Sequence, residues 1–191
     1  MLMNAEFLHG KFQTAVPYAA FVALGAPDGH DHAWRQRYEQ LALDAEQQNL
    51  TGGFTRAMKV LCLTGTWCGD CALQGAAMQR VAEAAPNVEL RFLLRTEEHA
   101  DLIVPNQING GFRVPVTWFM AEDFEPVSRM GDRTLSRYRS MARKTLGPAA
   151  PVVASPPADP VRAVLGEVLD EFERVQLVLR LSPRLRERHG D

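Results

Sequence analysis

Two cysteines separated by two residues are the part of this sequence best suited to chemistry. Cys68 and Cys71 lie in the segment Trp67-Cys68-Gly69-Asp70-Cys71, and the third cysteine of the 191-residue chain, Cys62, stands six positions before Cys68. A structural disulfide framework uses an even number of cysteines that are spread along a small secreted chain. Three cysteines this close together indicate local thiol chemistry instead.

The spacing of Cys68 and Cys71 lets their sulfur atoms meet in a disulfide across one helical turn. If Cys68 lies at a helix N-terminus, unpaired backbone N–H groups point at its sulfur and stabilise the thiolate, which is the nucleophilic form. A cysteine titrates near ~8.5 in a peptide and at roughly 7 or below in such a position. We therefore expect Cys68 to attack a disulfide and Cys71, one turn inside the helix, to be the buried resolving thiol.

A zinc half-site is the main alternative for the same pair. A structural zinc ion needs four ligands, and the chain has no second Cys-x-x-Cys motif. No histidine pair has the usual spacing, and His30 and His32 in the loop 29–32 are interpreted as solvated. An iron–sulfur cluster normally takes four ligands, and the chain has three cysteines. We expect no metal and no cofactor.

The elements that must position the cysteine pair follow from the apolar pattern around it. Residues 59–64 predict a buried strand, residues 65–70 a turn, residues 71–85 a helix ended by Pro86, and residues 88–95 a second strand. This unit implies a parallel strand pair with a right-handed crossover.

Two further strands and a helix complete the central pattern. After an irregular stretch at 96–113, residues 114–120 and 127–130 predict an antiparallel pair. A last helix follows residues 131–134, with one apolar face made of Leu135, Tyr138, Met141, Ala142 and Leu146.

The chain divides into four predicted parts. These are a helical N-terminal extension over residues 1–56, a central domain over 57–146, a Pro/Ala-rich linker over 147–159 and a C-terminal amphipathic helix and tail over 160–191. Within the extension we expect one helix from Pro17 to Leu24 and a second with Asp31 as its N-cap.

Residues 160–181 predict a long amphipathic helix that begins at Asp159 and Pro160. Its apolar stripe consists of Val161, Leu165, Val168, Phe172, Val175 and Leu179. Each such side chain contributes about 1.5–3 kcal/mol when fully buried, so the stripe must be covered. We expect it to pack within a monomer, beside the N-terminal helices, and keep a dimer through residues 160–181 as the alternative.

Three ordered landmarks in residues 57–146 resemble those of the thioredoxin superfamily. They are the pentapeptide at 67–71, the dipeptide Val114-Pro115, whose proline is cis in that family, and Gly131 before the last helix. The string at 65–71, together with a helical extension, looks like a bacterial thioredoxin-like subfamily of unassigned substrate. The resemblance implies an α/β thioredoxin-like fold, a central mixed sheet flanked by helices, with the N-terminal extension and the C-terminal helix added.

The resemblance also implies roles for individual residues. Cys68 would form the mixed disulfide with a substrate, and Cys71 would release it. Trp67 would shield the pair and form part of a docking surface. Pro115 in cis would shape the groove, and Val114 would offer its backbone to an extended substrate segment.

Two residues depart from the thioredoxin pattern. Asp70 stands where thioredoxin has proline, and with Gly69 it would modulate the cysteine pair. Its charge should disfavour the Cys68 thiolate, or its carboxylate should cap the helix, and both interpretations stay open. Cys62 stands where thioredoxin has a buried aspartate. We interpret it as a buried strand residue, with a third redox thiol as the alternative.

Composition and charge narrow the function classes. The chain is 46% hydrophobic and 23% charged, with a formal net charge of −2, which is typical of a soluble globular protein. We expect no nucleic-acid or membrane partner and, since no secretory signal is visible, a cytoplasmic location. Arg91, Arg95 and Arg113 are interpreted as solvated, with a basic surface near the site as the alternative.

The leading hypothesis is a thiol–disulfide oxidoreductase. It would reduce or exchange disulfides of a protein or a small molecule and take electrons from an unidentified donor. The alternative is a binding module with the same fold and little redox activity. An oxidant or isomerase of an oxidising compartment is disfavoured by the missing signal and by Asp70.

Overall fold

The computed structural model describes residues 3–147, 151 and 154–191, and its centre is a mixed sheet. The sheet has the order β2-β1-β3-β4, with β1 at Met58–Thr64, β2 at Val88–Leu94, β3 at Val116–Met120 and β4 at Pro126–Met130. β1 and β2 are parallel, and the other two pairs are antiparallel. The predicted strands and their directions are therefore confirmed.

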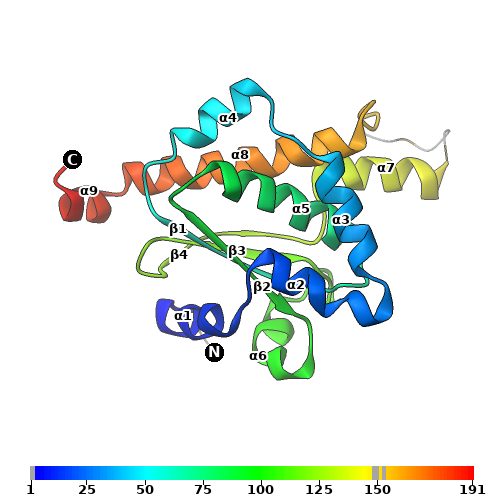
Figure 1. Cartoon of the computed structure of the whole chain (residues 1–191), viewed down its shortest axis with the longest axis horizontal. Helices are drawn as coiled ribbons and strands as arrows, with labels where there is room; N and C mark the ends of the chain where they lie inside the picture. The colour runs from blue at the N-terminus through cyan, green and yellow to red at the C-terminus, as the bar shows by residue number, and fades with distance from the viewer. Residues whose placement is uncertain (1–2, 148–150, 152–153) are drawn as a thin grey trace.

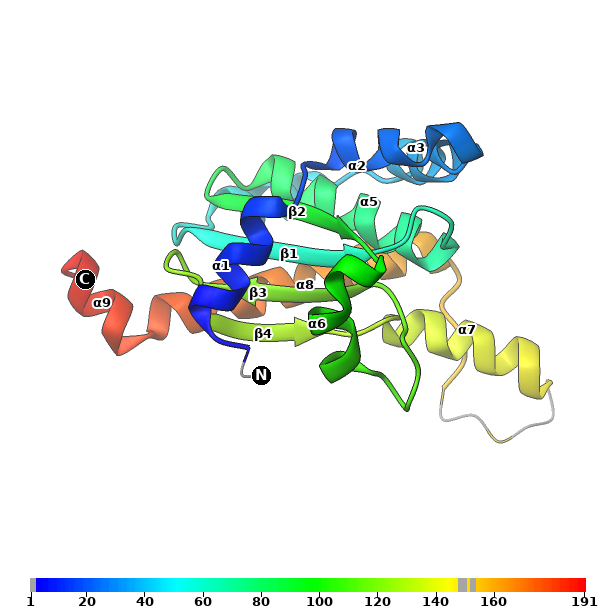
Figure 2. The ribbon, with the colours of Figure 1, turned by 90° about the horizontal axis from the view of Figure 1, so that it is seen from below.

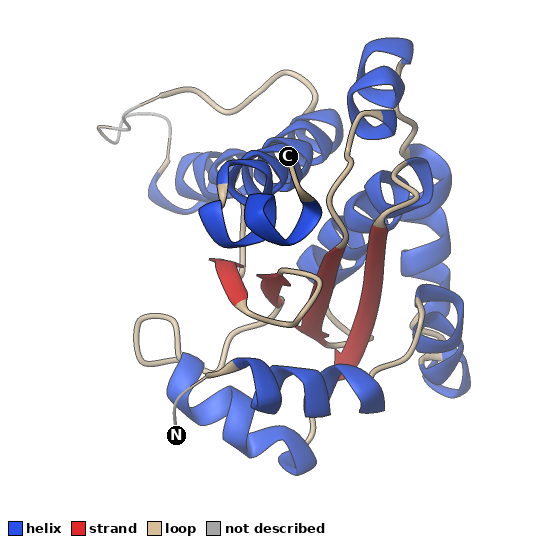
Figure 3. Cartoon of the chain, turned by 90° about the vertical axis from the view of Figure 1, so that its left-hand side faces the viewer, coloured by secondary structure: helices blue, strands red, loops and turns tan. Residues whose placement is uncertain are grey.

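Helices cover both faces of this sheet (Figures 1 and 3). One face carries α5 (Gly69–Ala84) and α8 (Pro160–Leu181), and the other carries α1 (Ala5–Thr14) and α6 (Ala100–Ile103). Strand β1 is buried on both sides because its side chains alternate between the two layers. Val60 and Cys62 join the larger core beside α5 and α8, whereas Leu61 and Leu63 join the smaller core beside α1.

The described part of the N-terminal extension, residues 3–56, is largely helical, as expected. Besides α1 it contains α2 (Tyr18–Leu24), α3 (Asp31–Gln40) and α4 (Ala45–Gly52), and α2 confirms the helix predicted from Pro17. The expected N-cap at Asp31 is wrong. His30 holds the cap position, and Asp31 lies in the first turn, where its carboxylate accepts a hydrogen bond from Arg35 Nε at 3.1 Å.

The C-terminal stripe is buried within the chain. Leu165, Val168 and Phe172 lie in the same core as β1 and α5. The main neighbour of α8 is α5, which the expectation did not include. The first turn of α8 does lie beside the N-terminal helices, as expected, since Arg162 pairs with Asp44, the N-cap residue of α4. Hydrogen bonds in both directions between Gln176 and the backbone of Arg56 (3.1 and 2.8 Å) tie α8 to the chain just before β1.

Three further features differ from the sequence-based expectation or add to it. The helix α7 (Leu135–Leu146) forms, but its apolar face is largely exposed and Ser136 is its buried residue. The stretch 96–113 contains α6 and short 3₁₀ turns. Ser182 ends α8 and caps another helix, α9 (Pro183–His189), by accepting a hydrogen bond from the Leu185 N–H.

The predicted linker at 147–159 lies partly outside the described residues, and the domain boundaries remain predictions. Among the helices of the described ranges, none combines the length and the hydropathy that a membrane span requires.

Candidate active site

Cys68 lies where the chain leaves β1 and enters α5. It is the N-cap residue of α5 with extended backbone angles (φ −95°, ψ 119°), and its Sγ accepts a hydrogen bond from the Cys71 backbone N–H at 3.3 Å. Both cysteines are free thiols; Cys68 is half-buried, whereas Cys71 is buried in the first turn. The helix start thus presents one accessible sulfur and one protected sulfur.

The surroundings of the two thiols shift their pKa values in opposite directions. The pKa of Cys68 is lowered to about 6, first by the hydrogen bond from the Cys71 thiol and further by backbone N–H groups, although burial and the charge of Asp70 oppose this. Burial, and then the neighbouring Cys68 sulfur, raises the pKa of Cys71. Near neutral pH the pair therefore holds its negative charge on Cys68.

The residues expected around the pair lie next to it. The Val114–Pro115 peptide bond is cis, as predicted, and the Val114 carbonyl oxygen lies 3.9 Å from Cys68 Sγ. Trp67 is about half exposed, at 48%. Its ring packs over Gly65, where an added Cβ would lie 2.7 Å from Trp67 Cζ2. An exposed aromatic face, a sulfur and an accepting carbonyl therefore lie side by side.

The Asp70 carboxylate is held by two guanidinium groups. Arg133 Nε donates to Asp70 Oδ2 at 2.6 Å, and Arg137 Nε donates to Asp70 Oδ1 at 2.8 Å. The helix cap is Cys68, so the interpretation of Asp70 as the cap is wrong. The charge of Asp70 acts to raise the pKa of Cys68, while its backbone N–H acts to lower it. Two positive charges this close to the carboxylate are expected to offset part of the effect of its charge on Cys68.

Arg133 and Arg137 were missed by the sequence analysis. Arg133 precedes the N-cap of α7 and Arg137 lies in its first turn, and two arginines this close to a helix start are the only signal that the sequence offers for them. Nothing in the local sequence links them to Asp70, more than sixty residues earlier.

The N-terminal helices support the turn that carries Cys68. Trp34 Nε1, on α3, donates to the Thr66 carbonyl oxygen at 2.9 Å, and His30 Nδ1 lies 3.1 Å from Thr66 Oγ1. His30 is therefore half-buried and hydrogen-bonded, which corrects its interpretation as solvated, whereas His32 is exposed as expected. Within the described ranges, no three side chains of the ligand types His, Cys, Asp and Glu are grouped for a metal ion.

Cys62 is a fully buried strand residue, as expected. Burial raises its pKa to about 12, although hydrogen bonds with Thr117 and Thr64 act in the opposite direction. A thiol in this position is protonated and shielded from solvent.

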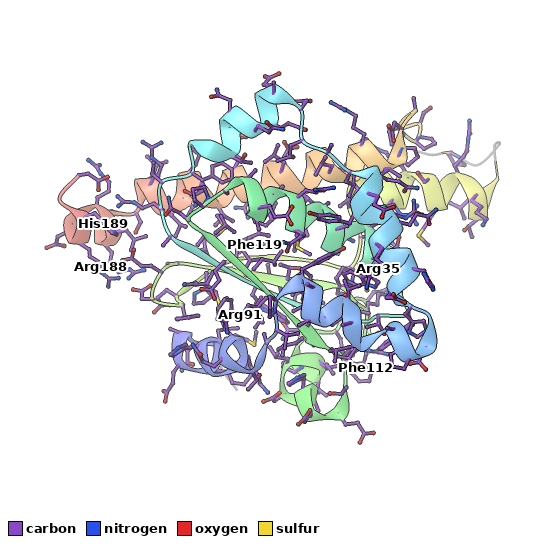
Figure 4. The ribbon with its side chains drawn as sticks, viewed as in Figure 1. Arg35, Arg91, Phe112, Phe119, Arg188 and His189 are labelled. Atoms are coloured by element: carbon purple, nitrogen blue, oxygen red, sulfur yellow. The ribbon has the colours of Figure 1, made fainter. Side chains whose placement is uncertain are left out.

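The three arginines considered for a basic surface lie in two places. Arg95 and Arg113 line a hollow next to Val114. Arg91 lies on the side of the sheet that faces α1, with its guanidinium 4.7 Å from the Phe12 ring centroid and paired with Glu89 (Figure 4). Arg95 and Arg113 therefore lie near the site, and Arg113 is also exposed, as the solvated interpretation expects.

Comparisons with known proteins agree with this geometry. Two solved structures resemble the chain: a protein of unknown function from Pseudomonas aeruginosa (19% identity, TM-score 0.61) and an HIV epitope scaffold (18% identity, TM-score 0.58). Each alignment covers 86% of this chain and 93% of the other, and at this identity the likeness shows the fold alone. No curated protein sequence matches the chain.

The sequence model described as thioredoxin matches residues 20–142 and so includes α2 and α3 as well as the sheet. A match to this family model supports a role in thiol–disulfide redox chemistry in general. On this match, which covers most of its length, the chain belongs to the thioredoxin family.

Proposed function

We propose that this protein is an enzyme that reduces or exchanges disulfides through Cys68 and Cys71. The observation that carries the proposal is the difference in accessibility and pKa between the two cysteines at the start of α5. Cys68 is accessible and its pKa is about 6, while Cys71 is buried, protonated, and has its backbone N–H 3.3 Å from Cys68 Sγ.

The reaction takes place in two exchanges that conserve thiols and disulfides. The Cys68 thiolate attacks one sulfur of a substrate disulfide, forms a mixed disulfide and releases the first substrate thiolate. Cys71 then loses its proton to that thiolate and attacks Cys68 Sγ, which forms the Cys68–Cys71 disulfide and releases the second substrate thiolate. Two electrons pass to the substrate, and an external dithiol must return them before another cycle.

The surroundings of Cys68 suit an extended disulfide substrate. Trp67 offers an apolar face, and Val114, preceding the cis Pro115, has its backbone at the sulfur. An attacking sulfur must approach along the axis of the S–S bond, and a segment aligned on Val114 would be held in that direction.

A trapping experiment tests the proposal. In Cys71→Ser the mixed disulfide on Cys68 cannot be resolved, so incubation with a neutral disulfide such as dithiodipyridine should leave one covalent adduct per chain. Prereduced wild type should instead release two thiopyridones and end as the internal disulfide. Cys62→Ser is the matched control and should behave as wild type.

If Cys68→Ser releases thiopyridone as fast as wild type, the assigned nucleophile is wrong. If prereduced wild type does not react with the disulfide at all, the binding-module alternative replaces the proposed function.

A further inference from the structure

An open hollow of about 450 Å³ lies beside the candidate active site and is not used by the proposed reaction. Its lining residues are Arg95, Phe112, Arg113, Val114, Asp132, Arg133 and Met141. Val114 links the hollow directly to Cys68, since its carbonyl oxygen lies 3.9 Å from the Cys68 sulfur. A chain segment that leaves a disulfide at Cys68 along Val114 would therefore run beside this hollow.

The hollow is positively charged. Three of its lining side chains are arginines and one is a carboxylate, Asp132, which pairs with Arg113 at 3.2 Å and with Arg133 at 2.9 Å. Arg95 instead donates to the Phe112 carbonyl oxygen at 2.6 Å and lies 5.6 Å from the Trp67 ring centroid. Both of these contacts are with neutral groups, so the charge of Arg95 is not compensated by them.

The basic character continues along α7, which starts at the hollow and projects from the body of the molecule (Figure 2). Residues 135–146 contain Arg137, Arg139, Arg143 and Lys144 and no acidic residue. This local excess contrasts with the net charge of −2 of the whole chain.

Apolar surface is interspersed with these charges. Phe112 is 50% exposed, and Met141 of α7 lines the hollow. Tyr138, 40% exposed, donates its hydroxyl to Asp132 Oδ1 at 2.6 Å, which places its ring beside the same cluster. A matching ligand therefore carries carboxylates with apolar atoms between them.

We propose that this hollow and the first turns of α7 bind an acidic segment that flanks the disulfide of a protein substrate. The inference rests on the proposed function and names the substrate class for it. Guanidinium groups match carboxylates through paired hydrogen bonds, and opposite charge mainly speeds association and selects the partner. Arg95 and Arg113 are the recognising residues, because neither one holds Asp70 beside the cysteines.

The test uses the prereduced full-length protein in a single turnover, so no electron donor is needed. Two peptide disulfides of equal length differ only in their flanks, which carry Asp and Glu in one and Asn and Gln in the other. We expect the acidic peptide to react several times faster in low salt and to lose this advantage at high ionic strength.

Substitutions of the two arginines test whether these residues cause the preference for the acidic peptide. Arg95→Gln with Arg113→Gln should reduce the preference for the acidic peptide by about three- to tenfold. Arg188→Gln is the matched control, because Arg188, like Arg113, is partly exposed (45%) and ion-paired, but it lies on α9 at the far end of the molecule from Phe112 (Figure 4). It should keep the wild-type preference.

The outcomes separate this inference from the proposed function. If neither peptide is reduced, the proposed function fails. If both peptides are reduced at equal rates in low salt, or if the arginine variants keep the preference, the acidic-segment inference is overturned. A small dicarboxylate disulfide that gains as much as the acidic peptide from Arg95 and Arg113 would also overturn it, because the surface would then select small anions.

Discussion

At the scale of single residues, the site combines groups that the sequence shows with groups that it does not. Cys68 and Cys71 could be assigned from spacing alone, since two residues between cysteines at a strand-to-helix junction have few other uses. The partners of Asp70 could not, because Arg133 and Arg137 come 63 and 67 positions later and meet it only in the folded chain.

The acidity of Cys68 gives the first prediction. Because its pKa is lowered to about 6, the rate of alkylation of wild type should rise with pH and reach half of its maximum near pH 6. The fast-reacting thiol should disappear in Cys68→Ser and persist in Cys71→Ser. A half-maximum near the ordinary value of ~8.5 would show that the helix start does not stabilise this thiolate.

Asp70 and its arginines give the second prediction. The charge of Asp70 raises the pKa of Cys68, so Asp70→Asn should lower that pKa by a few tenths to about one pH unit, and Arg137→Gln should raise it by a similar amount. A higher pKa destabilises the thiolate of the reduced form and favours the disulfide, so the reduction potential should follow the order Asp70→Asn, wild type, Arg137→Gln, from highest to lowest.

The double variant Asp70→Asn/Arg137→Gln provides the control for this pair. If Arg137 acts mainly by neutralising Asp70, its substitution should change the Cys68 pKa less when Asp70 is absent. An equal change in both backgrounds would mean that Arg137 acts on Cys68 directly.

At the scale of elements, the strands and α5 followed from apolar patterns because both faces of the sheet are covered. β1 is buried on both sides and reads as a continuous apolar run. The pattern of α7 correctly predicted one apolar face, but Leu135 and Leu146 on that face are 59% and 62% exposed. A pattern reports which residues share a face and not whether another element covers it. The N-cap predicted at Asp31 is wrong by one residue, since His30 holds that position. The exact ends of a helix are harder to predict from a pattern than the helix itself.

The contact between α3 and α5 gives the third prediction. A Cβ on Gly75 of α5 would overlap the ring of the fully buried Trp34, which holds the Thr66 carbonyl before Cys68. Gly75→Ala should therefore lower the free energy of unfolding by about 1–3 kcal/mol, as overpacked cores do, despite the higher helix propensity of alanine.

Gly166→Ala is the matched control in α8, since a Cβ there meets no atom within 4 Å. It should raise the free energy of unfolding by about 0.5–1 kcal/mol. Urea unfolding of both variants checks the pair, and equal effects would show that Trp34 does not require the glycine at position 75.

At the scale of the whole molecule, segments from both ends of the chain share one core. Phe21 and Trp34 from the N-terminal helices, Val60 from β1 and Leu165 from α8 belong to the same buried cluster. Phe119 of β3, labelled in Figure 4, meets Phe172 of α8 edge to face with ring centroids 5.1 Å apart. Sequence alone identified the stripe of α8 and its need for cover but did not identify α5 as the main neighbour, because an apolar stripe does not specify which apolar surface covers it.

This shared core gives the last prediction, that α8 unfolds together with the sheet. Leu165 is 1% exposed and Leu177, on the same helix, is 50% exposed. Leu165→Ala should cost about 2–5 kcal/mol because it leaves a cavity in the common core, whereas Leu177→Ala should change stability by less than about 0.5 kcal/mol. Unfolding in urea is followed with two probes, tryptophan fluorescence and the reactivity of Cys62, which is buried on β1. Both midpoints should shift together in Leu165→Ala. If the urea midpoint of Cys62 reactivity keeps its wild-type value in Leu165→Ala, α8 unfolds separately from the sheet and does not stabilise it.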